Sequence, residues 1–115
     1  MLERRATDAL WRELRDAVVA AVNDHNAAAH APIHIDDGSA LVLSLERGQR
    51  HLELQGSREA VICLMWSGAD PGTRMKMFIG LRPGAVPPFR LDGHAKSAAA
   101  VAAQLLTMFL VEDDR

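Results

Sequence analysis

Residues 39–80 decide the fold, and they read SALVLSLERGQRHLELQGSREAVICLMWSGADPGTRMKMFIG. Apolar and polar side chains alternate over 41–46, 51–55 and 74–79, and this period predicts strands with one face turned toward a core. Residues 60–66 are apolar at every position, which predicts a central strand. Because the links between these runs are short and rich in Gly, Asp and Pro, we expect the strands to pair as antiparallel neighbours.

A helix is expected on each side of this stretch. Apolar residues recur at helical spacing from near Leu2 or Thr7 to about Ala29, and Pro32 then favours an end to the helix. A second helix is predicted from about His94 to Val111, with Asp92 as its N-cap. The expected fold class is therefore α+β, with an N-terminal helix, a four- to five-stranded antiparallel meander sheet and a C-terminal helix.

The segments that flank the strands are expected to be less regular. Residues 33–35 are interpreted as a short strand or an extended entry to the sheet, and the Asp-Asp-Gly sequence at 36–38 as a turn. Three prolines in 81–93 remove backbone donors, so this segment is expected to be a loop or a sheet edge. Its apolar residues would anchor it on the core: Val86, Phe89 and Leu91.

Composition indicates one ordinary globular domain spanning residues 1–115. The chain is 49% hydrophobic and 24% charged, and its net charge of -2 gives no general attraction to nucleic acid or to an anionic membrane. We therefore expect neither of these partners. The single cysteine, together with the lack of a signal peptide or a long apolar run, predicts a soluble cytoplasmic protein. The excess of Arg over Lys is typical of a GC-rich, bacterial genome.

Signals for catalysis or metal binding are weak. His25, His30 and His34 lie close in sequence, but their spacing matches no metal motif, and solvated histidines near a helix end are the simpler interpretation. Cys63 lies in the most apolar strand, which favours a buried structural thiol over a nucleophile. No phosphate-binding glycine motif is present. We expect no metal and no cofactor.

Basic residues gather between positions 74 and 96, where the sequence has five of them and only one acid, Asp92. Arg74, Lys76 and Phe78 are expected to share one face of the strand over 74–80. Basic side chains beside an aromatic ring suit an anionic partner, and with stacking they would suit a nucleic acid. The net acidic charge and the aromatic content of 4% favour a small anionic ligand or an acidic protein patch, and Glu53 on a neighbouring strand favours simple charge pairing. The five basic residues are Arg74, Lys76, Arg82, Arg90 and Lys96.

The second face of the sheet leaves two alternatives open. If both helices cover one face, the other exposes Val42, Phe78 and one half of the apolar strand. That half is either Ile62, Leu64 and Trp66 or Val61, Cys63 and Met65. Such a patch is typical of an interface, and a two-fold homodimer needs only one self-complementary patch. If the helices lie on opposite faces, both faces are core.

The function predicted is a non-catalytic interaction or ligand-binding module, homodimeric through a sheet face. The residues expected at the interface or ligand site are Trp66, Arg74, Lys76, Phe78, Arg82, Arg90 and His94. The alternative is a small enzyme or an anionic-ligand domain with a cleft near 81–93. There His94 would act as an acid or base beside Arg90 and Asp92.

Overall fold

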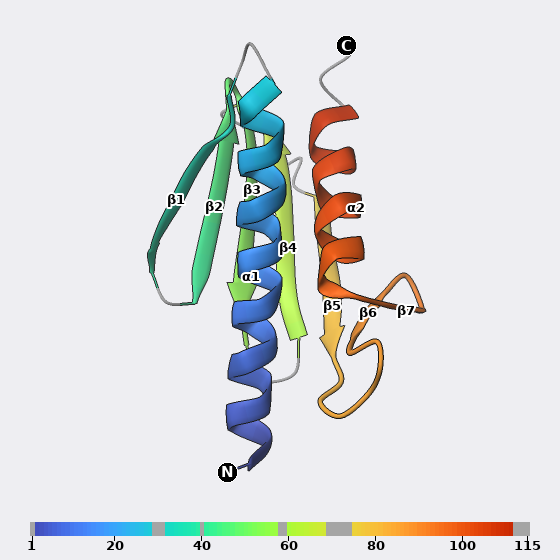
Figure 1. The fold of residues 1–115 in the computed structure, drawn as a ribbon. Coiled ribbons are helices and arrows are strands. Elements are labelled where there is room, and N and C mark those ends of the chain that lie inside the picture. Colours follow the sequence, from blue (N-terminus) through green and yellow to red (C-terminus); the bar gives the residue numbers. More distant parts are fainter. Residues whose placement is uncertain (1, 29–31, 40, 58–59, 69–74, 112–115) are drawn as a thin grey trace.

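The computed structural model describes residues 2–28, 32–39, 41–57, 60–68 and 75–111. Within those ranges the chain forms two helices and a seven-stranded antiparallel sheet, which confirms the expected α+β class (Figure 1). The strands lie in the sheet in the order of the sequence, as a meander. The elements are α1 (Leu2–Ala28), β1 (His34–Ser39), β2 (Val42–Arg47), β3 (Arg50–Gly56), β4 (Ala60–Ser67), β5 (Met75–Leu81), β6 (Phe89–Leu91), β7 (His94–Lys96) and α2 (Ala98–Val111).

The expected strand number of four to five was too low because β6 and β7 were not foreseen, and the short strand considered at 33–35 proved longer. At the first end of the sheet, residues 36–38 belong to β1 and do not form a turn. Ile35 pairs with Leu45 and Asp36 with Ser44, and the register is irregular between Asp36 and Ser39. Pairing with the edge of β2 therefore outweighs the local turn preference of this Asp-Asp-Gly sequence.

At the other end, residues 89–91 of the segment expected to be a loop or a sheet edge form β6. Residues 94–96, expected at the start of the second helix, form β7. Asp92 and Gly93, with φ of 54° and 79°, form the two-residue link between them, as an Asp-Gly hairpin turn requires. The prolines all precede β6, so the strand loses no backbone donor to them. Phe89 is buried as expected, whereas Val86 is 97% exposed and does not anchor the segment.

The second helix begins later than expected, and Asp92 is not its cap. Ser97 precedes α2, and its hydroxyl accepts a hydrogen bond from the Ala100 amide at 3.2 Å. This is the geometry of an N-cap, which satisfies one of the free amides of the first turn. Asp92 lies in the hairpin turn, where its carboxylate accepts a hydrogen bond from Gln104 at 3.2 Å.

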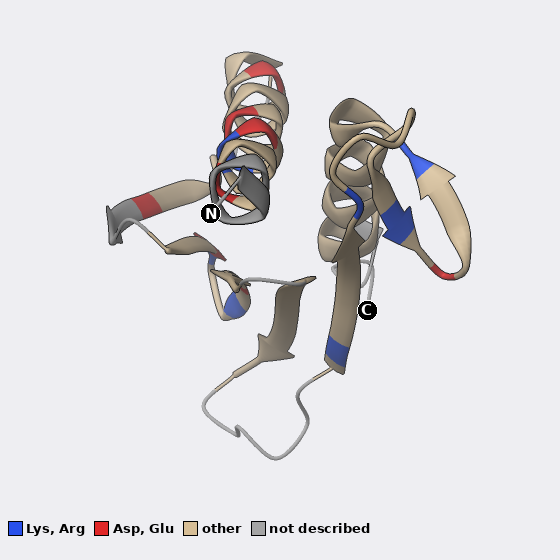
Figure 2. Cartoon of the chain, turned by 90° about the horizontal axis from the view of Figure 1, so that it is seen from below, with Lys and Arg blue, Asp and Glu red and all other residues tan. Residues whose placement is uncertain are grey.

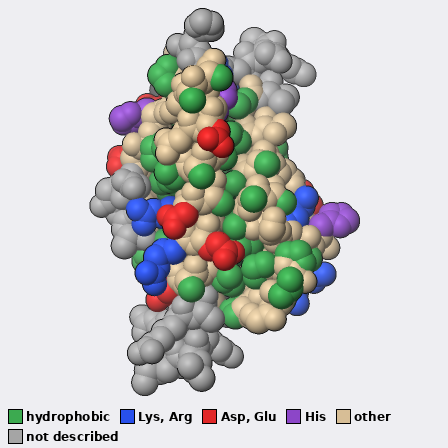
Figure 3. All heavy atoms as spheres, viewed as in Figure 1, with side chains coloured by type: hydrophobic (Ala, Val, Ile, Leu, Met, Phe, Trp, Pro, Cys, Tyr) green, Lys and Arg blue, Asp and Glu red, His purple; other side chains and the backbone are tan. Residues whose placement is uncertain are grey.

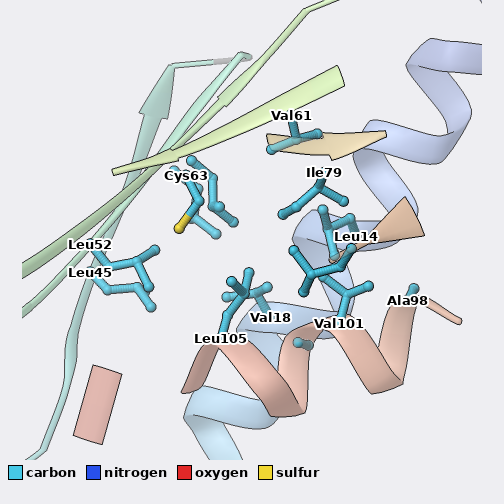
Figure 4. Close-up of a cluster of buried hydrophobic side chains, with 14 of the residues drawn as sticks. Leu14, Val18, Leu45, Leu52, Val61, Cys63, Ile79, Ala98, Val101 and Leu105 are labelled. Atoms are coloured by element: carbon cyan, nitrogen blue, oxygen red, sulfur yellow. The ribbon is translucent and has the colours of Figure 1, made fainter. Parts of the chain in front are cut away.

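The core lies between the sheet and the two helices. Alternate residues of the strands face the helices, among them Leu45, Leu52, Cys63 and Ile79, and all four are buried. Figure 4 shows these side chains converging on residues that α1 and α2 contribute from the other side. The helical contribution includes Leu14, Val18, Val101 and Leu105. No helix in the described part of the chain combines the length and the apolar character that crossing a membrane requires.

Both helices cover the same face of the sheet. Figure 2 looks along the helix pair and shows α1 and α2 together on one side of a sheet that curves toward them. The arrangement with helices on opposite faces is thereby excluded. The other face of the sheet, which no described helix covers, is called the open face below.

Candidate functional site

Cross-strand pairing arranges the open face in rows that run across the strands. One row contains His34, Glu46, His51 and Trp66, from β1 to β4. The next row contains Asp36, Ser44, Glu53, Leu64 and Lys76, from β1 to β5. A third contains Val42, Gln55, Ile62 and Phe78. Directly paired side chains on one face of a sheet lie close enough to interact, so neighbouring side chains within a row can contact one another.

The centre of the open face is apolar. β4 contributes Ile62, Leu64 and Trp66, which are half-buried, while Val61, Cys63 and Met65 face the helices and are buried. Of the two alternatives left open by the sequence, Ile62, Leu64 and Trp66 are therefore the half of the strand on the open face. Phe78 lies beside Ile62 and is 59% exposed, so the segment after β5 does not cover it. A contiguous group of exposed apolar side chains on a small domain is typical of a binding surface.

Toward β1 the open face is acidic and hollowed. A hollow of about 210 Å³ is lined by residues that include His34, Asp36, Glu46, Glu53 and Trp66. The imidazole of His51 stacks on the indole of Trp66, with ring centroids 5.0 Å apart and ring planes at 13°. Its Nδ1 atom lies 3.7 Å from a carboxylate oxygen of Glu46, a distance at which a protonated imidazole would form an ion pair. The stacked pair lies at the edge of the apolar centre.

Sequence reasoning did not select His34, Glu46 or His51 as site residues. Their alignment depends on the register of three strands, and β1 was not expected to be a full strand. The available signal was the alternation over 41–46 and 51–55, which puts Glu46 and His51 on the polar face of a hairpin. The two-residue link Gly48-Gln49 pairs Arg47 with Arg50, and the next pair along the hairpin is therefore Glu46 with His51.

Toward β6 the open face is basic. Lys76 and Phe78 share this face as expected, and the Lys76 ammonium lies 5.3 Å from the centre of the Phe78 ring. Arg90 pairs with Gly80 and is exposed on the same side. Arg82 is exposed directly after β5. Arg74 lies outside the described residues.

His94 lies apart from the other predicted site residues. It pairs with Leu91, whose side chain is buried on the helix side, whereas Arg90 pairs with Ala95 on the open face. His94 and Arg90 therefore belong to opposite faces of the β6–β7 hairpin. The arrangement proposed for an acid or base beside Arg90 is not formed, and Asp92 is directed to Gln104.

The single thiol is buried in the core. Cys63 is fully buried, and burial raises the pKa of its thiol from 9.0 to about 12, because the charged thiolate is poorly solvated there. A nucleophilic cysteine needs the opposite shift. Among the residues that the structure describes, no three His, Cys, Asp or Glu side chains are grouped so that they could hold a metal ion.

The helix side differs from the open face in its pattern of charge. Figure 3 shows charged side chains gathered over α1, whereas the surface over α2 is apolar or uncharged. Exposed positions of α1 include Arg12, Glu13 and Asp16, while α2 carries no charged residue from Ala98 to Val111. Alanines make up much of its exposed surface, and small side chains alone do not define a binding site.

The open face is therefore the surface that gathers the largest share of the predicted site residues: Trp66, Lys76, Phe78 and Arg90. The fold by itself assigns no activity, because small helix-and-sheet scaffolds support many unrelated functions. Comparison of the chain with protein-family models, with curated proteins and with solved structures finds no match in any of the three.

Proposed function

We propose that this protein is a non-catalytic interaction module that binds a second copy of itself through the open face of its sheet. The observation that carries the proposal is the apolar centre of that face, where Ile62, Leu64 and Trp66 are half-buried and Phe78 is exposed. Exposing such a group to water is unfavourable, and covering it with another apolar surface stabilises a complex. We place the module in the cytoplasm, since its one thiol fits a reducing compartment.

Two features support a binding role over a catalytic one. His94 and Arg90 were the residues considered for acid or base catalysis near 81–93. They lie on opposite faces of the β6–β7 hairpin, so they cannot act together. The Cys63 thiol is buried and its pKa is raised, so the reactive thiolate is disfavoured. The open face instead resembles an interface in its composition, with aromatic and aliphatic side chains at the centre and charges around them.

The test is the effect on self-association of truncating the two aromatic side chains of the open face, Trp66 and Phe78. Trp66→Ala and Phe78→Ala should each raise the dimer dissociation constant by about 30-fold, because truncating an aromatic interface anchor typically costs about 2 kcal/mol. Val86→Ala is the matched control, since Val86 is 97% exposed but lies in the loop before β6. Sedimentation equilibrium measures the constants, and far-UV circular dichroism checks that each variant is folded. Equal constants for all three variants and the parent would contradict the proposal.

A second candidate, binding of a small anionic molecule, is favoured by one observation. Lys76 and Arg90 are both exposed on the open face, on β5 and β6. A ligand that binds only the folded protein raises its melting temperature. Thermal-shift measurements with inorganic phosphate and with ATP would support this function if they gave an increase that Lys76→Ala and Arg90→Ala abolish. An unchanged melting temperature at millimolar ligand would leave self-association as the function of this face.

A further inference from the structure

The open face carries opposite charges on the two sides of β4. Leu64 pairs with Glu53 on β3 and with Lys76 on β5, so one acid and one base flank it in the same row. Neighbouring strands are about 4.8 Å apart, which puts the two backbone positions about 10 Å from each other. Glu53 accepts a hydrogen bond from Gln55, and Lys76 lies over Phe78. Among the residues described, neither forms an ion pair.

We propose that two copies of the chain pack open face against open face about a two-fold axis that runs along β4. This arrangement rests on the self-association proposed above and adds its geometry. Rotation about such an axis lays β3 of one copy over β5 of the other. Leu64 then meets the partner's Leu64 on the axis. Glu53 faces the partner's Lys76, and Lys76 faces the partner's Glu53, so the interface contains the same acid–base pair twice.

The charges select this axis over the other simple choice. A two-fold axis across the strands through Leu64 would lay each strand over its own copy. Glu53 would then face the partner's Glu53, and Lys76 the partner's Lys76, and like charges facing each other in an interface are unfavourable. With the axis along β4, each Glu53 instead faces the partner's Lys76, and both contacts are attractive. It also suits the usual aligned packing of two sheets, whose strands cross at about 30°.

The shape of the sheet is compatible with this contact. The sheet curves toward the helices, so its open face bulges outward across the strands, and the middle strands are the first to meet a partner (Figure 2). The middle strand of the seven is β4, which carries the apolar centre. Packed sheets lie about 10 Å apart, a gap that a Glu and a Lys side chain can bridge from opposite sides. The two pairs of Glu53 with the partner's Lys76 would thus lie on either side of a central apolar contact.

Charge reversal tests the axis. In the full chain, Glu53→Lys places Lys against the partner's Lys76, and Lys76→Glu places Glu against the partner's Glu53. Each should raise the dimer dissociation constant by about tenfold, whereas the double variant E53K/K76E restores both attractions and should return within about threefold of the parent. Glu13→Lys and Arg12→Glu, exposed on α1, are the matched controls and should leave the constant unchanged.

Sedimentation equilibrium at low salt gives the constants, and circular dichroism reports folding. If Glu53→Lys does not fold, Glu53→Gln replaces it, with an expected increase of about threefold. A parent dimer that depends on Trp66 but whose constant is unchanged by either reversal, or not restored in the double variant, overturns the axis and leaves self-association intact. A parent that is monomeric at all concentrations overturns both proposals.

Discussion

Arg50 joins the sheet to the end of the second helix through Phe109. Its Nε atom donates a hydrogen bond of 3.0 Å to the Phe109 carbonyl, and its guanidinium lies 6.0 Å from the centre of the Phe109 ring. The last carbonyls of a helix have no partner within the helix and carry partial negative charge. Arg50 is only 8% exposed, so it supplies both a donor and a positive charge in a poorly solvated place.

Replacing Arg50 by Met should therefore destabilise the fold. The variant keeps much of the side-chain volume but loses the charged hydrogen bond, and we expect the free energy of unfolding to fall by about 2 kcal/mol. Arg82→Met is the control, since Arg82 is exposed and its loss should change the stability by less than about 0.5 kcal/mol. Urea unfolding followed by circular dichroism measures both. Equal stability of the two variants would mean that the bond to Phe109 contributes nothing.

The packing of α1 on β3 depends on a glycine. A Cβ atom built on Gly56 would lie 2.9 Å from the Trp11 indole, which is closer than such atoms approach in real structures. Gly56→Ala should lower the free energy of unfolding by about 2 kcal/mol, because the buried indole must move. At Gly80 the nearest atom to a built Cβ lies 3.4 Å away, so Gly80→Ala should be tolerated. The same cost at both positions would contradict this account of the Trp11 contact.

The raised pKa of Cys63 makes stability depend on pH in the alkaline range. Above pH 9 the thiol of the unfolded chain loses its proton, whereas the folded thiol, with a pKa of about 12, keeps it. The unfolded state then binds fewer protons, so stability is fully present below pH 9 and declines as pH rises toward 12. Between pH 8 and pH 10 the parent should lose about 1.4 kcal/mol more than Cys63→Ala. Parallel pH profiles in urea unfolding would rule out this linkage.

The sequence predicted the framework of the fold because its strongest signals are local. Alternation over 41–55 and the apolar run at 60–66 gave three consecutive strands of the sheet, and helical spacing gave both helices. The extension of β1 over 36–38 and the strands β6 and β7 were missed because pairing partners, rather than local preference, hold these residues in the sheet. The Asp92-Gly93 link was the local clue to the last hairpin, and the N-cap assignment to Asp92 obscured it.

The candidate site was less predictable than the fold. Period-two alternation placed Lys76 and Phe78 together, and the structure bears this out. Which half of β4 lies on the open face could not be known until both helices were found on one side. The relation between Glu53 and Lys76 needs the register of three strands, and register follows from the whole sheet rather than from any one segment. Arg90 and His94, close in sequence, separate because a strand turns successive positions to alternate faces.

The most direct test of the central claim is the mass of the parent protein in solution, measured by light scattering after size exclusion at low and at high salt. The chain has a mass of 12.5 kDa, and self-association through the open face predicts twice that value. The dimer should persist at high salt, because Ile62, Leu64, Trp66 and Phe78 form the centre of the contact and only the flanking charges are screened. A mass of one chain under both conditions would contradict the claim that the open face binds a second copy.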